Sequence, residues 1–152
     1  MKVSRKTDAA IALSVALMPA VAQLIFGDLL YVGTWYYFVV PITAIAIGVI
    51  ARAKPLFLLG TSLAVSLTLL IYAAVNLSLA RPEGFLALGH LFSLSGAAIG
   101  TLIGAFLSRR LSNQISAMAL GFIRTLVGFV INQLVVCNSL VSCGAISSLF
   151  SS

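Results

Sequence analysis

The chain contains four long apolar segments that carry almost no charge. They cover about residues 9–26, 30–51, 56–80 and 85–107. Each holds roughly the 17 to 25 residues that an α-helix needs to cross the hydrocarbon core of a bilayer. Because no water is present there to bond the backbone, such a segment crosses as a helix. The sequence therefore predicts an all-α, polytopic integral membrane bundle with four to five transmembrane helices and short loops.

The composition supports a membrane domain without a soluble one. Of the 152 residues, 61% are hydrophobic and 8% are charged, which lies outside the usage of soluble domains. The predicted spans take up most of the chain, so we expect residues 1–152 to form a single transmembrane domain. The nine Lys and Arg residues are scattered at segment ends and form no basic face, so nucleic acid is not an expected partner.

The basic residues also predict the orientation of the chain. Seven of the nine fall on one side of the predicted membrane, whereas Asp28, Arg81 and Glu83 fall on the other. By the positive-inside rule the N-terminus is cytoplasmic, and we expect the chain in a bacterial inner membrane. The seven residues are Lys2, Arg5, Lys6, Arg52, Lys54, Arg109 and Arg110.

The first apolar segment has a second interpretation. It also fits a cleavable signal peptide, because it has a basic start, an apolar run from Ala9 and the small residues Ala20 and Ala22. Asp8 lies unusually close to the basic residues for such a peptide. We therefore favour a retained first helix.

The last forty or so residues allow two arrangements, because the apolar pattern there is interrupted by Arg124, Asn132 and Gln133. In one, an interfacial helix at 111–124 precedes a fifth span. In the other, a single longer helix begins near Ala117, and Arg124 reaches back to the headgroups by snorkelling. The fifth span is expected at about 120–141.

Aromatic and basic side chains near the segment ends are expected to anchor the helices at the membrane interface. Aromatic rings favour the headgroup layer, and long basic side chains reach it from within the bilayer. The expected interfacial anchors are Tyr31, Trp35, Tyr36, Arg109, Arg110 and Arg124.

The two cysteines, Cys137 and Cys143, form a possible disulfide. On a continuous helix their Cα atoms would be separated by about 9 Å of axial rise, which is more than a disulfide tolerates. The bond therefore requires the helix to end near Cys137, and free thiols remain the alternative. The chain has one histidine and no Cys-x-x-Cys pair, so we expect neither a metal site nor a cofactor.

Small and polar residues mark the fourth apolar segment. Gly96, Gly100 and Gly104 recur every four residues, with Ala97 beside them, and predict close helix packing or an oligomer interface. Polar side chains form one stripe on the third segment and another on the fourth. These stripes either lock the bundle or line a polar path or ligand site. Their members are Thr68, Tyr72 and Asn76 on the third segment, and His90, Ser93 and Thr101 on the fourth.

The sequence gives little support for catalysis. Its acidic residues are Asp8, Asp28 and Glu83, and the familiar hydrolase, metalloprotease and nucleotide-binding motifs are absent, so we expect no enzyme and no catalytic residue. Proton-coupled or cation-coupled carriers generally need a buried charge, which the first four spans lack. We therefore expect a small protein, of the immunity or exclusion type, that recognises another membrane protein or a membrane-inserting toxin. The alternative is a homo-oligomeric channel or carrier with a polar path lined by the third and fourth helices. Its expected partners are the lipid bilayer and further copies of the chain.

Overall fold

The computed structural model describes residues 3–27, 30, 32–78 and 84–139. It confirms the all-helical prediction, and five helices are present among the described residues. Four of them are long and apolar enough to cross a membrane, whereas α2 is shorter, with 17 residues. The helices are α1 (Arg5–Phe26), α2 (Thr34–Ile50), α3 (Phe57–Ser78), α4 (Gly84–Ser108) and α5 (Gln114–Ser139).

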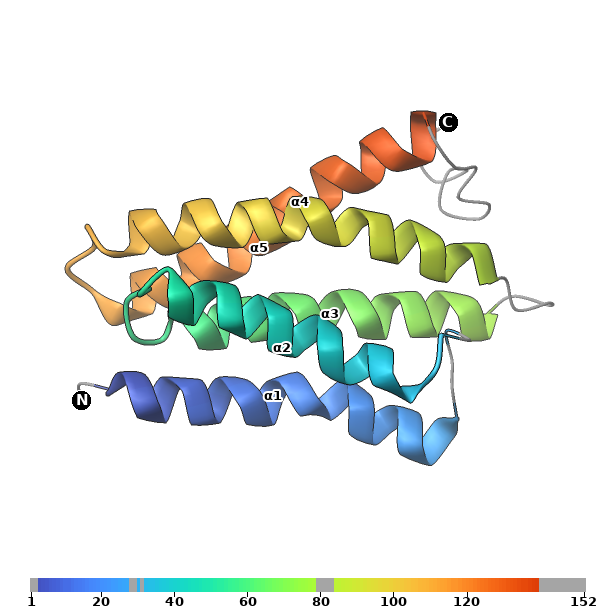
Figure 1. Ribbon diagram of the computed structural model, residues 1–152, viewed down its shortest axis with the longest axis horizontal. Coiled ribbons are helices and arrows are strands. Elements are labelled where there is room, and N and C mark those ends of the chain that lie inside the picture. The colour runs from blue at the N-terminus through green and yellow to red at the C-terminus, as the bar shows by residue number, and fades with distance from the viewer. Residues whose placement is uncertain (1–2, 28–29, 31, 79–83, 140–152) are drawn as a thin grey trace.

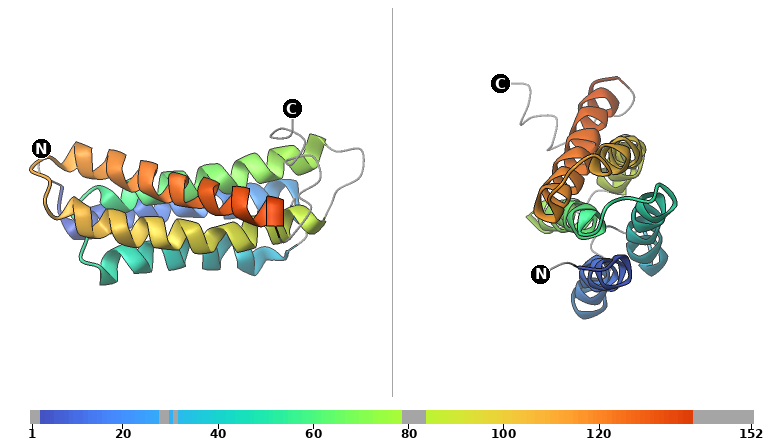
Figure 2. Two further views of the ribbon diagram at one scale, coloured as in Figure 1. Left: turned by 90° about the horizontal axis from the view of Figure 1, so that it is seen from above. Right: turned by 90° about the vertical axis from the view of Figure 1, so that its left-hand side faces the viewer.

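The five helices run lengthwise beside one another, with α3 in the middle (Figures 1 and 2). One side of α3 packs against α1 and α2, and the other side packs against α5, which in turn packs along α4. The contact between α2 and α4 is much smaller than that between α4 and α5. Figure 1 also shows that the N-terminus, the α2–α3 connection and the α4–α5 connection lie at the same end. We call this the basic end, because it carries Arg5, Lys6, Arg52, Lys54, Arg109 and Arg110.

Glycines bring α5 close to both of its neighbours. A Cβ atom added at Gly96 would collide with the backbone of Gly128, and one added at Gly100 would collide with the backbone of Arg124. On the other side of α5, Gly60 of α3 lies equally close to the backbone of Met118. Helix backbones approach this closely only where side chains are missing. The glycines of α4 therefore serve packing within one chain.

The α5 segment corrects one of the two arrangements expected for the C-terminal region. A single helix runs from Gln114 to Ser139, so no separate interfacial helix covers 111–124. The first turns of α5 are instead part of the bundle, since Ala117 is fully buried and Gly121 packs against the backbone of Phe57. Small residues at these positions allow close contact with α3, which a helix lying at the membrane surface would not make.

The start of α3 is held by a side chain from α1. The carboxylate of Asp8 accepts hydrogen bonds from the backbone N–H groups of Leu58, at 3.3 Å, and Leu59, at 3.1 Å. The first N–H groups of a helix have no partner within it, and its positive end favours an anion. Asp8 therefore caps α3 from a distance of fifty residues in sequence. The connection before α3 turns sharply, with positive φ angles at Arg52 and Leu56.

Candidate functional site

A fully buried histidine joins three helices in the half of the bundle away from the basic end. His90 of α4 has no exposed surface. Its Nδ1 lies 2.6 Å from the hydroxyl of Tyr36 on α2, and its Nε2 lies 3.2 Å from Oγ1 of Thr68 on α3. These two contacts use both ring nitrogens. His90 is therefore the point at which α2, α3 and α4 are tied together by side chains.

The neighbouring hydrogen bond assigns the protons in this cluster. Thr68 Oγ1 donates to the carbonyl of Val65 at 2.8 Å, so it receives the proton of His90 Nε2–H. Nδ1 then carries the lone pair and accepts from the Tyr36 hydroxyl. The network is complete with a neutral imidazole. Rings of Tyr72 and Phe129 surround His90, with centroids 4.8 Å and 5.1 Å from its own.

The other polar residues predicted on α4 are bonded to α5. Ser93 Oγ donates to the side-chain carbonyl of Gln133, and Thr101 Oγ1 lies 2.9 Å from Thr125 Oγ1. The candidate polar residues therefore do not form a single row along α3 and α4 in the described part of the chain. They form separate links between helices at different depths. Asn76 is buried on α3, where Thr68 and Tyr72 are also buried.

Tyr36 corrects the expected set of interfacial anchors. Its side chain is 2% exposed and reaches His90, whereas the adjacent Trp35 is 60% exposed. The interior face of α2 can be followed in the sequence, because Tyr36, Val40 and Gly48 recur at helical spacing. Sequence reasoning missed Tyr36 as a member of the buried cluster because an aromatic ring near a span end also fits the headgroup layer.

The remaining expected anchors occupy different positions. Tyr31 lies outside the described residues, and Arg110 is exposed at the basic end. Arg109 donates from Nε to the carbonyl of Ala51 at 3.0 Å, and Ala51 is the C-cap residue of α2. Arg124 is exposed on α5 and has no hydrogen-bond or ion-pair partner among the described residues.

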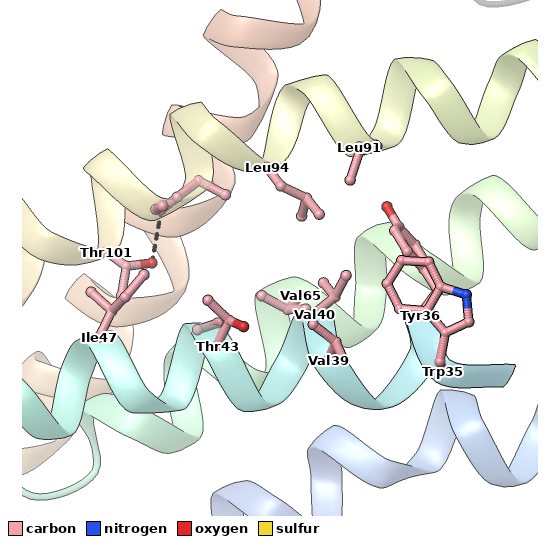
Figure 3. A pocket seen from close by; sticks show the side chains of 13 residues that line it. Trp35, Tyr36, Val39, Val40, Thr43, Ile47, Val65, Leu91, Leu94 and Thr101 are labelled. Carbon is pink, nitrogen blue, oxygen red and sulfur yellow. Dashed lines mark hydrogen bonds between the residues drawn. The ribbon is translucent and has the colours of Figure 1, made fainter. Parts of the chain in front are cut away.

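A cleft opens between α2 and α4 (Figure 3). Its volume is about 170 Å³. Branched aliphatic side chains from both helices line it, and Val65 of α3 forms part of its wall. Hydroxyl groups are contributed to the lining by Tyr36, Thr43 and Thr101. A dry cavity of about 150 Å³ accepts a benzene-sized apolar group. This cleft has room for one apolar side chain or a short piece of an acyl chain.

A groove of about 280 Å³ follows the seam between α4 and α5. Asn132 ties the two helices together there by donating from Nδ2 to the carbonyl of Phe92 at 2.7 Å. Arg124 contributes the charged side chain of the lining. The groove therefore combines an apolar surface with an unpartnered cation. Its residues are Gly96, Ile99, Gly100, Ile103, Arg124, Val127, Gly128, Ile131 and Asn132.

The structure describes one of the two cysteines of the predicted disulfide. Cys137 is disulfide-bonded in the structure, and Gln133 donates from Nε2 to its Sγ at 2.8 Å. Cys143 lies outside the described residues. No cluster of three or more His, Cys, Asp or Glu side chains suited to a metal ion occurs in the described ranges.

Comparisons with known proteins do not place this chain in a family. No family model, curated protein or solved structure matches it.

Proposed function

We propose that this chain is an integral protein of a bacterial inner membrane that recognises another membrane protein through the groove between α4 and α5. Membrane insertion is supported by the outer surface of the bundle, where large apolar side chains are exposed on every described helix. Ile25 is 70% exposed and Ile50 is 81% exposed. Contiguous apolar surface of this kind is unfavourable in water and favourable in lipid.

The basic end supports one orientation of the chain in the membrane. The described cations Arg5, Arg52 and Arg109 lie there, with further Lys and Arg residues beside them. Cytoplasmic segments of membrane proteins are enriched in such residues. We therefore propose that the basic end, with the N-terminus, faces the cytoplasm.

Recognition of a partner is supported above all by Arg124. It is a cation on an apolar helix with no partner among the described residues, and a carboxylate on a neighbouring helix would stabilise a charge in such a position. Among its described residues, a second copy of the chain offers no free carboxylate. Asp8, the one acidic side chain in that part of the chain, is bonded to the start of α3, and Asp28 and Glu83 lie outside the described residues. The proposed partner is therefore a different protein whose spanning helix carries a carboxylate.

The packing within the bundle supports recognition over conduction. The glycines that would join subunits of a channel are packed against α5 of the same chain. The polar side chains of α3 and α4 are bonded between helices at His90, Ser93 and Thr101. These groups are already used to hold the bundle together. The outward groove, which also carries Arg124, remains as a surface for a partner.

Site-specific photo-crosslinking in membranes of the producing organism tests this proposal. A photoreactive residue is placed at Val127 or Ile131 in the groove, and at Ile50 as an exposed control outside it. We expect one discrete adduct with another membrane protein from the groove positions alone. It should weaken in Arg124→Gln and persist in Arg110→Gln, which removes an equal charge at the basic end.

Three other outcomes would overturn the proposal. An adduct of the chain with itself would favour the homo-oligomeric channel or carrier. Adducts with lipid alone would mean that the groove is an ordinary lipid-facing surface. Equal adducts from the groove and from Ile50 would show that the contacts are not specific. Labelling of a Ser112→Cys variant with an impermeant thiol reagent checks the orientation, because Ser112 lies in the α4–α5 connection and should react only after the membrane is opened.

A further inference from the structure

Four basic side chains from distant parts of the sequence line one cavity at the basic end. Arg5 comes from α1, Arg52 and Lys54 from the α2–α3 connection, and Arg109 from the α4–α5 connection. The cavity has a volume of about 370 Å³. The positive-inside rule requires cations on this side of the membrane, but it does not require them to surround a common space. Their convergence is a property of the fold.

Backbone carbonyl groups hold three of these four cations in place. Arg109 donates to the carbonyl of Ala51 at 3.0 Å, and Arg5 donates to the carbonyl of Arg52 at 3.4 Å. Lys54 Nζ donates to two carbonyls of the α4–α5 connection. Carbonyl oxygens fix the positions of the side chains without cancelling their formal charge. The four charges therefore share one cavity, three of them are oriented by carbonyl groups, and none is neutralised.

The carboxylate nearest to this cluster is already occupied. Asp8 is the one acidic side chain among the described residues, and it is 1% exposed. Both of its hydrogen bonds come from backbone N–H groups at the start of α3, and it bonds none of the four cations. The cavity thus lacks a counter-ion from the described part of its own chain.

We propose that this cavity binds the phosphate group of an anionic phospholipid. Guanidinium groups bond phosphate oxygens in pairs, and an added ammonium group strengthens such a site. The cavity lies where the helices end, which is the level of lipid headgroups if the helices span a bilayer. The exposed apolar residues Val49 and Ile50 precede the cavity on α2 and offer a surface to the acyl chains of the same lipid. A phosphate attached to a lipid therefore fits better than free phosphate.

The site can be tested on the full chain purified in a neutral detergent. Native mass spectrometry measures how tightly phosphatidylglycerol, phosphatidylcholine and inorganic phosphate are each retained. We expect one phosphatidylglycerol to bind more tightly than phosphatidylcholine and to resist displacement by inorganic phosphate. Binding of inorganic phosphate in preference to phosphatidylglycerol, or equal binding of the two lipids, would overturn the assignment.

Matched charge variants distinguish a built site from general attraction. The Arg52 side chain makes no hydrogen bond among the described residues, so Arg52→Gln removes a charge from the cavity without removing a helix contact. We expect it to weaken phosphatidylglycerol binding by about tenfold, as expected for one charge-assisted contact. Arg52→Lys should restore most of the binding. Arg110→Gln removes an equal charge from a residue outside the cavity lining and should change binding less than about twofold.

Equal losses in Arg52→Gln and Arg110→Gln would mean that lipid is attracted by net charge alone, and would overturn the proposal. Thermal melting of each variant in detergent shows whether the bundle is intact, and Arg5→Gln provides a second cavity variant if Arg52→Gln fails to fold. This inference concerns the basic end and uses neither Arg124 nor the groove between α4 and α5. It stands or falls independently of the proposed protein partner.

Discussion

The helix α4 packs against two neighbours in two different ways. Against α5 it uses Gly96 and Gly100, and the backbones themselves come into contact. Against α2 it presents Leu91 and Leu94, whose side chains hold the helices apart and leave a cleft of about 170 Å³. Tyr36, which is bonded to His90, lines this cleft. Small residues thus produce an interface of direct backbone contact with several hydrogen bonds across it, and large residues leave one that depends on the bond between Tyr36 and His90.

The strongest test of this difference is a leucine introduced on each side of α4. Gly100→Leu forces a side chain into the backbone of Arg124, so we expect a loss of more than about 3 kcal/mol in the free energy of unfolding. Ala98→Leu instead adds atoms to the cleft and should change that free energy by less than about 1 kcal/mol. Unfolding by SDS titration in mixed micelles measures both. Equal costs would show that the two interfaces do not differ as described.

Removal of the histidine should break the weaker interface. His90→Ala deletes the bonds to Tyr36 and Thr68 and leaves a cavity among buried rings. We expect a loss of about 2–4 kcal/mol in the free energy of unfolding, from the combined packing and hydrogen-bond terms. Phe92→Ala truncates a 45% exposed side chain on the same helix and should cost less than about 1 kcal/mol. A cost for His90→Ala no greater than that of the control would contradict the central role of His90.

A third variant tests whether the Asp8 side chain holds α1 and α3 together, as close backbone packing holds α4 and α5 together. Asp8→Ala leaves the N–H groups of Leu58 and Leu59 without their acceptor. The expected cost is about 1–2 kcal/mol, as for loss of a helix cap, with Asp8→Asn between the variant and the wild type. Hydrogen exchange at these two amides should accelerate in Asp8→Ala. Unchanged exchange would mean that Asp8 does not hold the start of α3.

These contrasts also show how far the sequence predicts the structure. Segment length and apolar content predict helices close to the observed α1, α3 and α4. The direction in which each helix faces is harder to predict, because lipid-facing and core-facing residues are both apolar in such a bundle. Trp35 and Tyr36 look alike in the sequence, yet one is exposed and the other is buried.

The candidate site was predictable only in part for the same reason. The pattern of polar residues on α3 and α4 singles out Thr68 and His90, which the structure brings together. It does not reveal Tyr36 as their partner. The role of Asp8 is also hidden, since its partners are backbone N–H groups that leave no mark in the residue types of α3. The continuity of α5 is obscured by Arg124, whose charge interrupts an otherwise apolar pattern.

The smallest expected effects come from two variants that each remove one hydroxyl group. One hydroxyl lies in the interface between α2 and α4, and the other lies in the interface between α4 and α5. Tyr36→Phe takes the donor from His90, and with little other contact between α2 and α4 we expect a cost of about 1–2 kcal/mol. Thr101→Val breaks the bond to Thr125, but glycine packing continues to hold α4 on α5, so the cost should be about 0.6 kcal/mol or less. The same SDS titration measures both, with hydrogen exchange of α2 amides as a local readout. Exchange in α2 should rise in Tyr36→Phe and stay unchanged in Thr101→Val. A larger cost for Thr101→Val than for Tyr36→Phe would mean that hydrogen bonds, and not glycine contacts, hold both interfaces. The two sides of α4 would then differ only in the distance between the helices.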